Sequence, residues 1–194
     1  TIDKQVGFSS FVEASQESVI MSDVTDRIIV NAGPGTGKTW TLIEKLIYMV
    51  EENETDPEGI LVLCFSRAAV EVIEKRLQES ALADRIGYSW RKIEIRTFDS
   101  FATYLIAWIQ EYYSHLLPNG FVLETQDYDS RIQTAIELLK KKDDILSQYE
   151  HIIVDEVQDL VGCRAEFVLQ ILSILPDNCG FTLFGDACQS IYDW

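Results

Sequence analysis

A glycine-rich segment, placed between a short apolar run and an amphipathic stretch, carries the residues best suited to chemistry. Residues 28–30 are Ile, Ile and Val, and residues 40–50 have the apolar spacing of a helix. This order predicts a strand, a loop and a helix, in which loop N–H groups surround phosphate oxygens at the positive end of the helix. The expected phosphate-binding residues are Ala32, Gly33, Pro34, Gly35, Thr36, Gly37, Lys38 and Thr39.

Two side chains of this loop and two downstream acids complete a set of groups for nucleotide chemistry. Lys38 can reach the β- and γ-phosphates of a nucleoside triphosphate, and the Thr39 hydroxyl can ligate Mg²⁺. Apolar residues 152–154 run into Asp155 and Glu156. A buried strand that ends in two carboxylates suits metal binding and general-base work. Together these residues predict a site that binds and hydrolyses a nucleoside triphosphate.

Composition limits the class of protein. The chain has 194 residues, of which 47% are hydrophobic, so it can bury the core of one domain. It has no apolar run of about 18 residues, and residues 1–10 lack the features of a signal peptide. The four cysteines have neither metal-ligand nor redox spacing, so we expect reduced thiols, a cytoplasmic location and no membrane partner.

The net charge of −16 argues, at face value, against nucleic-acid binding. However, several of the acids fall in one expected loop at residues 51–58. Net charge is a poor guide when a ligand binds in a single cleft, so a nucleic-acid partner stays open at this point.

Strand and helix patterns alternate along the chain. We predict strands at residues 27–31, 60–65, 92–97, 149–155 and 181–185, and helices at residues 38–50, 67–82, 98–113 and 164–175. The apolar runs are short and continuous, as in strands that are covered on both faces. The alternation predicts an α/β fold with a parallel sheet flanked by helices, whose ligands bind beyond the carboxyl ends of the strands.

One stretch interrupts the alternation. Residues 114–148 contain a turn signal at residues 118–120 and helical apolar spacing over residues 130–146. Ser130 is the expected N-cap of that helix, and the lysines at residues 140–142 favour its C-terminal end. We interpret residues 114–148 as a small helical insertion in a nucleotide-binding core.

Five segments, in order and spacing, resemble the motifs of UvrD/Rep-like superfamily-1 helicases. Residues 184–194 resemble motif III, and residues 154–159 resemble motif II. Residues 65–69 resemble motif Ia, and residues 97–101 resemble the next DNA-contacting motif. Gln16 lies where this family has its adenine-reading glutamine. The resemblance covers residues 16–194 and implies a RecA-like P-loop NTPase core.

The resemblance implies roles for the residues of the nucleotide site, with ATP and Mg²⁺ as cofactors. The carboxamide of Gln16 would donate to and accept from the adenine edge. Asp155 would hold Mg²⁺, through water because Mg²⁺ keeps much of its hydration. Glu156 would orient and deprotonate the attacking water. Lys38, Glu156 and Gln189 form the expected catalytic set, with Gln189 sensing the γ-phosphate.

The resemblance also implies a nucleic-acid face on the same edge of the sheet. Aromatic rings there would stack on bases, and hydroxyl and cationic groups would contact the phosphate backbone. The implied residues are Phe65, Ser66, Arg67, Thr97, Ser100, Tyr192 and Trp194. Three features depart from the family. Asp99 replaces a common histidine and puts an anion near the presumed phosphate track. Arg67 and Ala68 replace a usual Asn-Lys pair, and the insertion is short.

The sequence is therefore interpreted as the first RecA-like domain, residues 1–194, of an ATP-dependent DNA helicase. The family resemblance implies translocation from 3′ to 5′. Its expected partners are single-stranded DNA or 3′-tailed duplex, and a second RecA-like domain of the same full-length chain. We expect the chain to end inside motif III and to be weakly active or inactive alone. Two alternatives stay open: a catalytically silent P-loop clamp on nucleic acid, and an RNA-directed helicase. A nucleotide kinase or a GTPase is disfavoured, because neither a lid with arginines nor a guanine-reading Asn-Lys-x-Asp is found.

Overall fold

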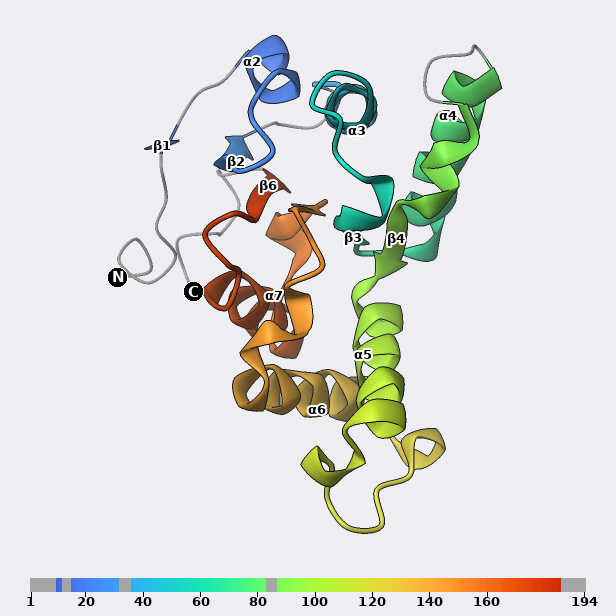
Figure 1. Ribbon diagram of the computed structural model, residues 1–194, viewed down its shortest axis with the longest axis vertical. Coiled ribbons are helices and arrows are strands. Elements are labelled where there is room, and N and C mark those ends of the chain that lie inside the picture. Colours follow the sequence, from blue (N-terminus) through green and yellow to red (C-terminus); the bar gives the residue numbers. More distant parts are fainter. Residues whose placement is uncertain (1–9, 12–14, 32–35, 83–86, 186–194) are drawn as a thin grey trace.

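The computed structural model describes residues 10–11, 15–31, 36–82 and 87–185 (Figure 1). The strands are β1 (Ser10–Phe11), β2 (Arg27–Asn31), β3 (Ile60–Cys64), β4 (Glu94–Thr97), β5 (His151–Val154) and β6 (Gly180–Gly185). The α-helices are α2 (Gln16–Ile20), α3 (Lys38–Glu51), α4 (Arg67–Leu82), α5 (Phe98–Tyr112), α6 (Tyr128–Lys141) and α7 (Cys163–Ser173). Short 3₁₀ helices are η1 (Pro57–Gly59), η2 (Gly87–Lys92), η3 (Ser114–Leu116), η4 (Leu123–Thr125), η5 (Asp143–Leu146) and η6 (Val157–Asp159).

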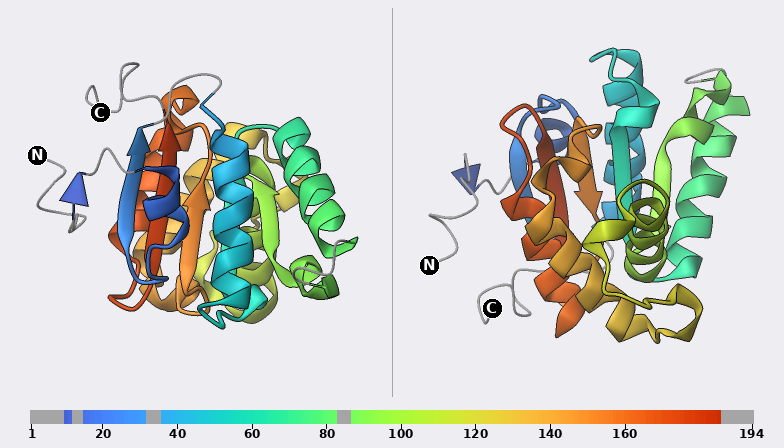
Figure 2. Two further views of the ribbon diagram at one scale, coloured as in Figure 1. Left: turned by 90° about the horizontal axis from the view of Figure 1, so that it is seen from above. Right: turned by 60° about the horizontal axis from the view of Figure 1, so that its bottom comes forward.

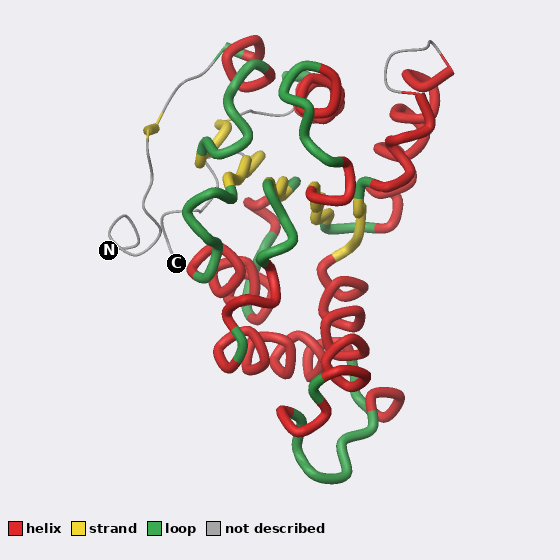
Figure 3. Tube along the Cα trace, in the orientation of Figure 1, coloured by secondary structure: helices red, strands yellow, loops and turns green. Residues whose placement is uncertain are grey.

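All strand pairs in the sheet are parallel, in the order β1-β2-β6-β5-β3-β4. The strands form a row between two sets of helices (Figure 3). The predicted α/β fold with a parallel sheet is therefore confirmed. Because every strand runs the same way, the carboxyl ends of β2 to β6 meet at one edge of the sheet.

Alternating side chains of each strand supply two separate cores, one on each face. Ile29, Leu61 and Ile152 pack with the apolar sides of α5, α6 and α7. Ile28, Val62 and Ile153 pack instead with α3 and α4. Figure 2 shows the two layers of helices on opposite sides of the sheet. Burial on both faces explains why the strands read as continuous apolar runs rather than as alternating ones.

The helices begin where the sequence offers a cap. The Thr97 hydroxyl accepts a hydrogen bond from Ser100 N (3.2 Å) and starts α5 immediately after β4. In α6 the cap is Asp127, whose Oδ1 accepts from Ser130 N (2.8 Å). The prediction that Ser130 is the N-cap is wrong, because the carboxylate three residues upstream takes that role and Ser130 lies inside the helix.

Helix α6 belongs to the main core. It packs against both α5 and α7 (Figure 1), and its buried residues are Ile132, Ala135, Ile136, Leu138 and Leu139. Lys140 and Lys141 lie in its last turn, where cations interact favourably with the helix dipole. No helix in the described part of the chain is long and apolar enough to cross a membrane.

Candidate functional site

Two structural features require a glycine at position 37, the start of α3. Gly37 is the N-cap of α3 with φ of +81°, a left-handed conformation that side chains rarely adopt. A Cβ there would also lie 2.9 Å from Nε2 of Gln16. Gly37 O accepts from both the backbone N–H (2.9 Å) and the hydroxyl (3.2 Å) of Thr41, which fixes the first turn of the helix. The predicted loop residues Ala32, Gly33, Pro34 and Gly35 lie outside the described residues.

Gln16, the residue expected to read the base, lies beside Thr36 of the predicted phosphate loop, although the two residues are 20 positions apart in sequence. Its Nε2 donates to Thr36 O, and its side chain is exposed. The Ser15 hydroxyl caps α2 by accepting from Ser18 N (3.3 Å). A hollow of about 160 Å³ is lined by α2, the end of β2 and the start of α3. Its lining includes Gln16, Val19, Asn31, Thr36, Lys38, Thr41 and Phe184.

A buried lysine holds α2 in place. The ammonium of Lys45, on α3, donates to Val19 O (3.2 Å), to Ser22 O (3.4 Å) and to the Ser22 hydroxyl (2.5 Å). Burial lowers the pKa of Lys45 to about 8, and the nearby carboxylates Asp26 and Asp23 oppose that shift. Sequence reasoning missed this residue, because a lysine within an amphipathic helix is expected on the solvent side.

Residues of β5 and β6 also hold the segment after α2 in place. Nδ1 of His151, on β5, lies 2.6 Å from Val24 O and therefore donates to it, which leaves Nε2 to accept from the Thr182 hydroxyl (2.9 Å). Burial lowers the pKa of His151 to about 3, so the imidazole is neutral near pH 7. At Gly180, on β6, a Cβ would lie only 2.2 Å from Val24 O and 2.5 Å from Asp26 O. Lys45, His151 and Gly180 together fix the course of residues 19–26.

The two acids after β5 occupy different environments. Asp155 is buried, and its N–H donates to Leu63 O (2.9 Å), which extends the sheet by one residue. Burial, together with the charge of Glu156, raises the pKa of Asp155 to about 6, while Lys38 opposes the shift. Glu156 has φ of +56° and turns the chain out of the sheet, with its N–H donating to Asp155 Oδ1 (3.0 Å). A buried carboxylate whose charge is poorly compensated suits a cation, and its hard oxygen atoms match Mg²⁺.

Lys38 and Glu156, which lie 118 residues apart in sequence, form an ion pair. Lys38 Nζ lies 2.7 Å from Glu156 Oε2, and the Gln158 amide donates to the same oxygen. Burial tends to raise the pKa of Glu156, but these two hydrogen bonds outweigh it, so the pKa is lowered. The fold therefore brings together the loop cation and the strand-end acid that the sequence placed in one site.

The end of β6 touches the segment that follows the acids. A Cβ on Gly185 would lie 2.4 Å from Cγ2 of Val157 and 3.2 Å from Oε1 of Gln158. Only glycine leaves room for this approach. Three residues of the expected site, Gln189, Tyr192 and Trp194, belong to the segment that resembles motif III. They lie outside the described residues.

The predicted nucleic-acid residues gather at the carboxyl ends of β3 and β4. Phe65 is 46% exposed, and Arg67 and Ser100 are exposed. The Ser66 hydroxyl accepts from Ala69 N (3.1 Å) as the Thr97 hydroxyl does from Ser100 N, so each O–H can still donate outward. Phe65, Arg67, Thr97 and Ser100 line one groove of about 1000 Å³.

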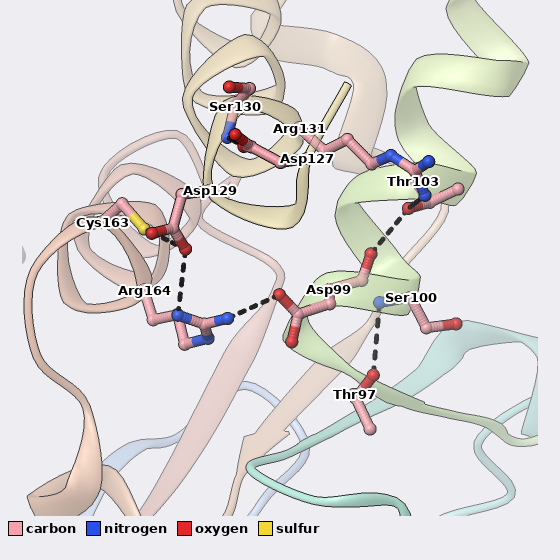
Figure 4. Close-up of polar contacts among 10 residues, drawn as sticks. All are labelled: Thr97, Asp99, Ser100, Thr103, Asp127, Asp129, Ser130, Arg131, Cys163 and Arg164. Carbon is pink, nitrogen blue, oxygen red and sulfur yellow. Dashed lines mark hydrogen bonds and ion pairs between the residues drawn. The ribbon is translucent and has the colours of Figure 1, made fainter. Parts of the chain in front are cut away.

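Asp99, the anion expected near the phosphate track, has a partner. Its Oδ1 lies 2.8 Å from Nη2 of Arg164, on α7, and Nη1 of Arg164 lies 3.3 Å from Asp129 Oδ1 (Figure 4). No local pattern predicts this contact, because Asp99 and Arg164 lie 65 positions apart. The charge of Asp99 is therefore compensated inside the protein.

In the described residues, the end of β2, the start of α3 and an acid pair after β5 meet at one edge of a doubly covered parallel sheet, which is the arrangement expected of a P-loop domain. The chain belongs to the UvrD/REP helicase N-terminal domain family, whose model matches residues 12–115 and 105–194.

Named relatives agree with this assignment. The chain is similar to Gabija protein GajB of Bacillus cereus, with 29% identity over 93% of this chain and 40% of the relative. It is also similar to the ATP-dependent DNA helicase PcrA of Staphylococcus aureus, with 21% identity over 93% of this chain and 34% of the relative. The corresponding PcrA of Staphylococcus epidermidis is 22% identical over the same shares. The chain thus spans between a third and two fifths of the length of these relatives.

Proposed function

We propose that this chain is the ATP-binding motor domain of a DNA helicase. In this proposal it binds ATP·Mg²⁺ and single-stranded DNA, and a second RecA-like domain of a longer chain completes the motor. Family membership supports the helicase class. The single observation that carries the proposal for this chain is the ion pair between Lys38 and Glu156 beside the buried Asp155.

The ion pair suggests how substrate entry activates the site. The triphosphate is a stronger anion than Glu156 and would attract Lys38 towards the phosphates. Glu156 then loses its cationic partner and becomes available to accept a proton from the attacking water. Gln158, which also donates to Glu156, would keep the carboxylate oriented after Lys38 has left.

Residues of this chain would also hold the metal ion. Thr39 and Asp155 would bind Mg²⁺, which supplies charge neutralisation at the phosphates when it is bound. The raised pKa of Asp155 fits this role, because a cation would compensate the buried charge. Gln16 would contact the base from α2, and Gln189 would sense the γ-phosphate.

The nucleic-acid strand is proposed to cross the carboxyl ends of β3 and β4. Phe65, with Tyr192 and Trp194, would stack on bases, while Ser66, Arg67, Thr97 and Ser100 would contact phosphates. Movement from 3′ to 5′ is proposed from the family resemblance. Residues 1–194 alone should be a poor ATPase, because an arginine supplied from outside the domain can contribute 10³–10⁵ in rate.

The test uses the full-length protein and two substitutions. Glu156→Gln should bind ATP but lose about 10²–10⁴-fold in hydrolysis, because the amide keeps the shape and lacks the base. Lys38→Ala should abolish nucleotide binding or hydrolysis. Glu166→Gln, at an exposed position on α7, is the control and should retain wild-type turnover.

The same assay separates the alternatives. Turnover stimulated by single-stranded DNA more than by RNA supports the proposal, whereas the reverse preference supports an RNA-directed helicase. Binding of ATP without measurable turnover by the wild-type protein supports a silent clamp. Undiminished turnover in both Lys38→Ala and Glu156→Gln would refute the assignment of the site.

A further inference from the structure

The groove that holds the predicted nucleic-acid residues has a wall that none of the sequence motifs supplies. Besides the ends of β3 and β4, it is lined by α4, by α5 and by the first turn of α6. Tyr128 and Arg131 are the two residues that α6 contributes. Figure 4 shows Arg131 reaching from α6 towards Thr103 on α5.

Two arginines of this groove lack an acidic partner within the described residues. Arg131 Nε donates to Gln126 O (3.1 Å) and Nη1 to the Thr103 hydroxyl (3.4 Å), both of which are neutral groups. Arg67 is exposed and forms no ion pair in the described part of the chain. The chain has 32 acidic and only 16 basic residues, so unpaired arginines are unexpected. Two in one groove point to an anionic ligand.

The carboxylates nearest to this wall are already engaged. Arg164 binds both Asp99 and Asp129 (Figure 4), and the Asp127 carboxylate caps α6. Glu71 is the remaining carboxylate among the described lining residues. Arg96 also lines the groove and is paired with Glu94. The lining therefore keeps an excess of cationic groups although the whole chain is strongly acidic.

Aromatic rings lie beside these arginines. Tyr128 is 60% exposed, and the guanidinium carbon of Arg131 lies 5.8 Å from the centre of its ring. Phe65, 46% exposed, lines the same groove from the end of β3. Exposed rings next to arginines suit a strand with unpaired bases, because the rings stack on bases and the cations bind phosphates.

We propose that the first turn of α6 is a further contact site for single-stranded DNA, in which Arg131 binds a backbone phosphate and Tyr128 stacks on a base. This inference rests on the proposed function and extends its nucleic-acid track to residues outside the five motifs. A duplex offers phosphates but no unpaired base for Tyr128, so the site favours the single strand.

The test measures binding of a labelled oligothymidylate to the full-length protein over a range of salt concentrations. Tyr128→Ala should weaken binding about 5- to 150-fold, which is the usual contribution of one stacked base. Arg131→Gln should weaken binding and reduce the slope of log affinity against log salt by about 0.7, the value for one phosphate of a single strand. Arg131→Lys should restore that slope, since the charge is retained.

Matched controls come from the same chain. Tyr112→Ala removes a tyrosine that is 61% exposed on α5 and does not line the groove, and Arg76→Gln removes an exposed arginine of α4 that also lies outside it. Both should bind the oligonucleotide as the wild type does. DNA-independent nucleotide binding should be unchanged in every variant.

The outcomes distinguish this inference from the proposed function. If Tyr128→Ala and Arg131→Gln keep wild-type affinity and salt slope while Phe65→Ala weakens binding, the α6 site is wrong and the proposed function stands. If the wild-type protein binds ATP but no oligothymidylate, the proposed function fails and this inference fails with it. If Arg131→Lys binds as poorly as Arg131→Gln with the same reduced slope, the residue is structural and the inference is overturned.

Discussion

Acid should destabilise this protein through His151, one of its two histidines. In the fold the imidazole is neutral, and its pKa is lowered to about 3 from the ordinary 6.5. The unfolded chain therefore binds a proton below pH 6.5, whereas the folded chain does not until about pH 3. Stability falls as the pH drops through this window, at about 1.4 kcal/mol per pH unit. Between pH 7 and pH 5 the loss attributable to His151 is about 2 kcal/mol.

The measurement compares thermal unfolding of the wild type and His151→Gln across that range of pH. His151→Gln should be less stable than the wild type at pH 7. The difference in the free energy of unfolding between the two proteins should narrow by about 2 kcal/mol at pH 5, which is about 4–8 °C in melting temperature. The pKa of Asp155 contributes equally to both proteins and cancels in the difference. His115→Gln, at an exposed position, is the control and should show no narrowing. A gap independent of pH would refute the reasoning, because it would mean that His151 titrates normally in the fold.

Three further predictions concern buried positions. Asp155→Asn should abolish Mg²⁺-dependent nucleotide binding. It should nevertheless stabilise the protein by about 2–3 kcal/mol at pH 8, because burial raises the pKa of the Asp155 carboxyl to about 6. Thermal unfolding should show this gain disappearing as the pH falls below 6, where Asp155 is protonated in the folded wild type. Lys45→Met removes the donor to the carbonyls of Val19 and Ser22 and should lower the free energy of unfolding by about 1–3 kcal/mol. In the full-length enzyme, KM for ATP should rise by a larger factor than kcat falls. Gly180→Ala should prevent folding, since the added Cβ would collide with two carbonyl oxygens; expression and circular dichroism test this. The control is Gly120→Ala, whose Cβ would meet nothing within 4 Å. It should cost only about 1 kcal/mol, because of the positive φ of Gly120.

Periodicity in the sequence was enough to predict the central elements. The strands were found because both faces of the sheet are covered, which makes each strand a short apolar run between polar ends. The sequence analysis missed the short elements β1 and α2, and its other errors lie at the boundaries of the elements. The sequence predicts that strand β4 starts at residue 92, but it begins at Glu94. Residues up to Lys92 form η2, and Ile93 N donates to Trp90 O (3.0 Å). A 3₁₀ turn of polar and aromatic residues leaves no periodic signal.

Part of the candidate site could be predicted from local order and part could not. Glu156 directly follows one strand pattern, and Lys38 follows the loop after another, so a parallel sheet brings both to one edge. Lys45, His151 and Arg164 were missed because their partners belong to other elements. Nothing near these residues in sequence distinguishes a buried, fully bonded lysine or histidine from an exposed one. Such contacts depend on tertiary packing and cannot be inferred from spacing alone.

The support of residues 19–26 by three separate elements has a consequence for how the gene can be altered. A connection between a helix and a strand is ordinarily a good place to insert a tag or a reporter domain. Here Lys45, His151 and Gly180 fix the carbonyls of this connection, so an added residue would shift every contact out of register. The turn at residues 118–120 is different, because it is exposed and Gly120 has open space around it. Of these two loops, the one beside α2 should reject insertions, and the one between η3 and η4 should accept a fluorescent label without loss of stability.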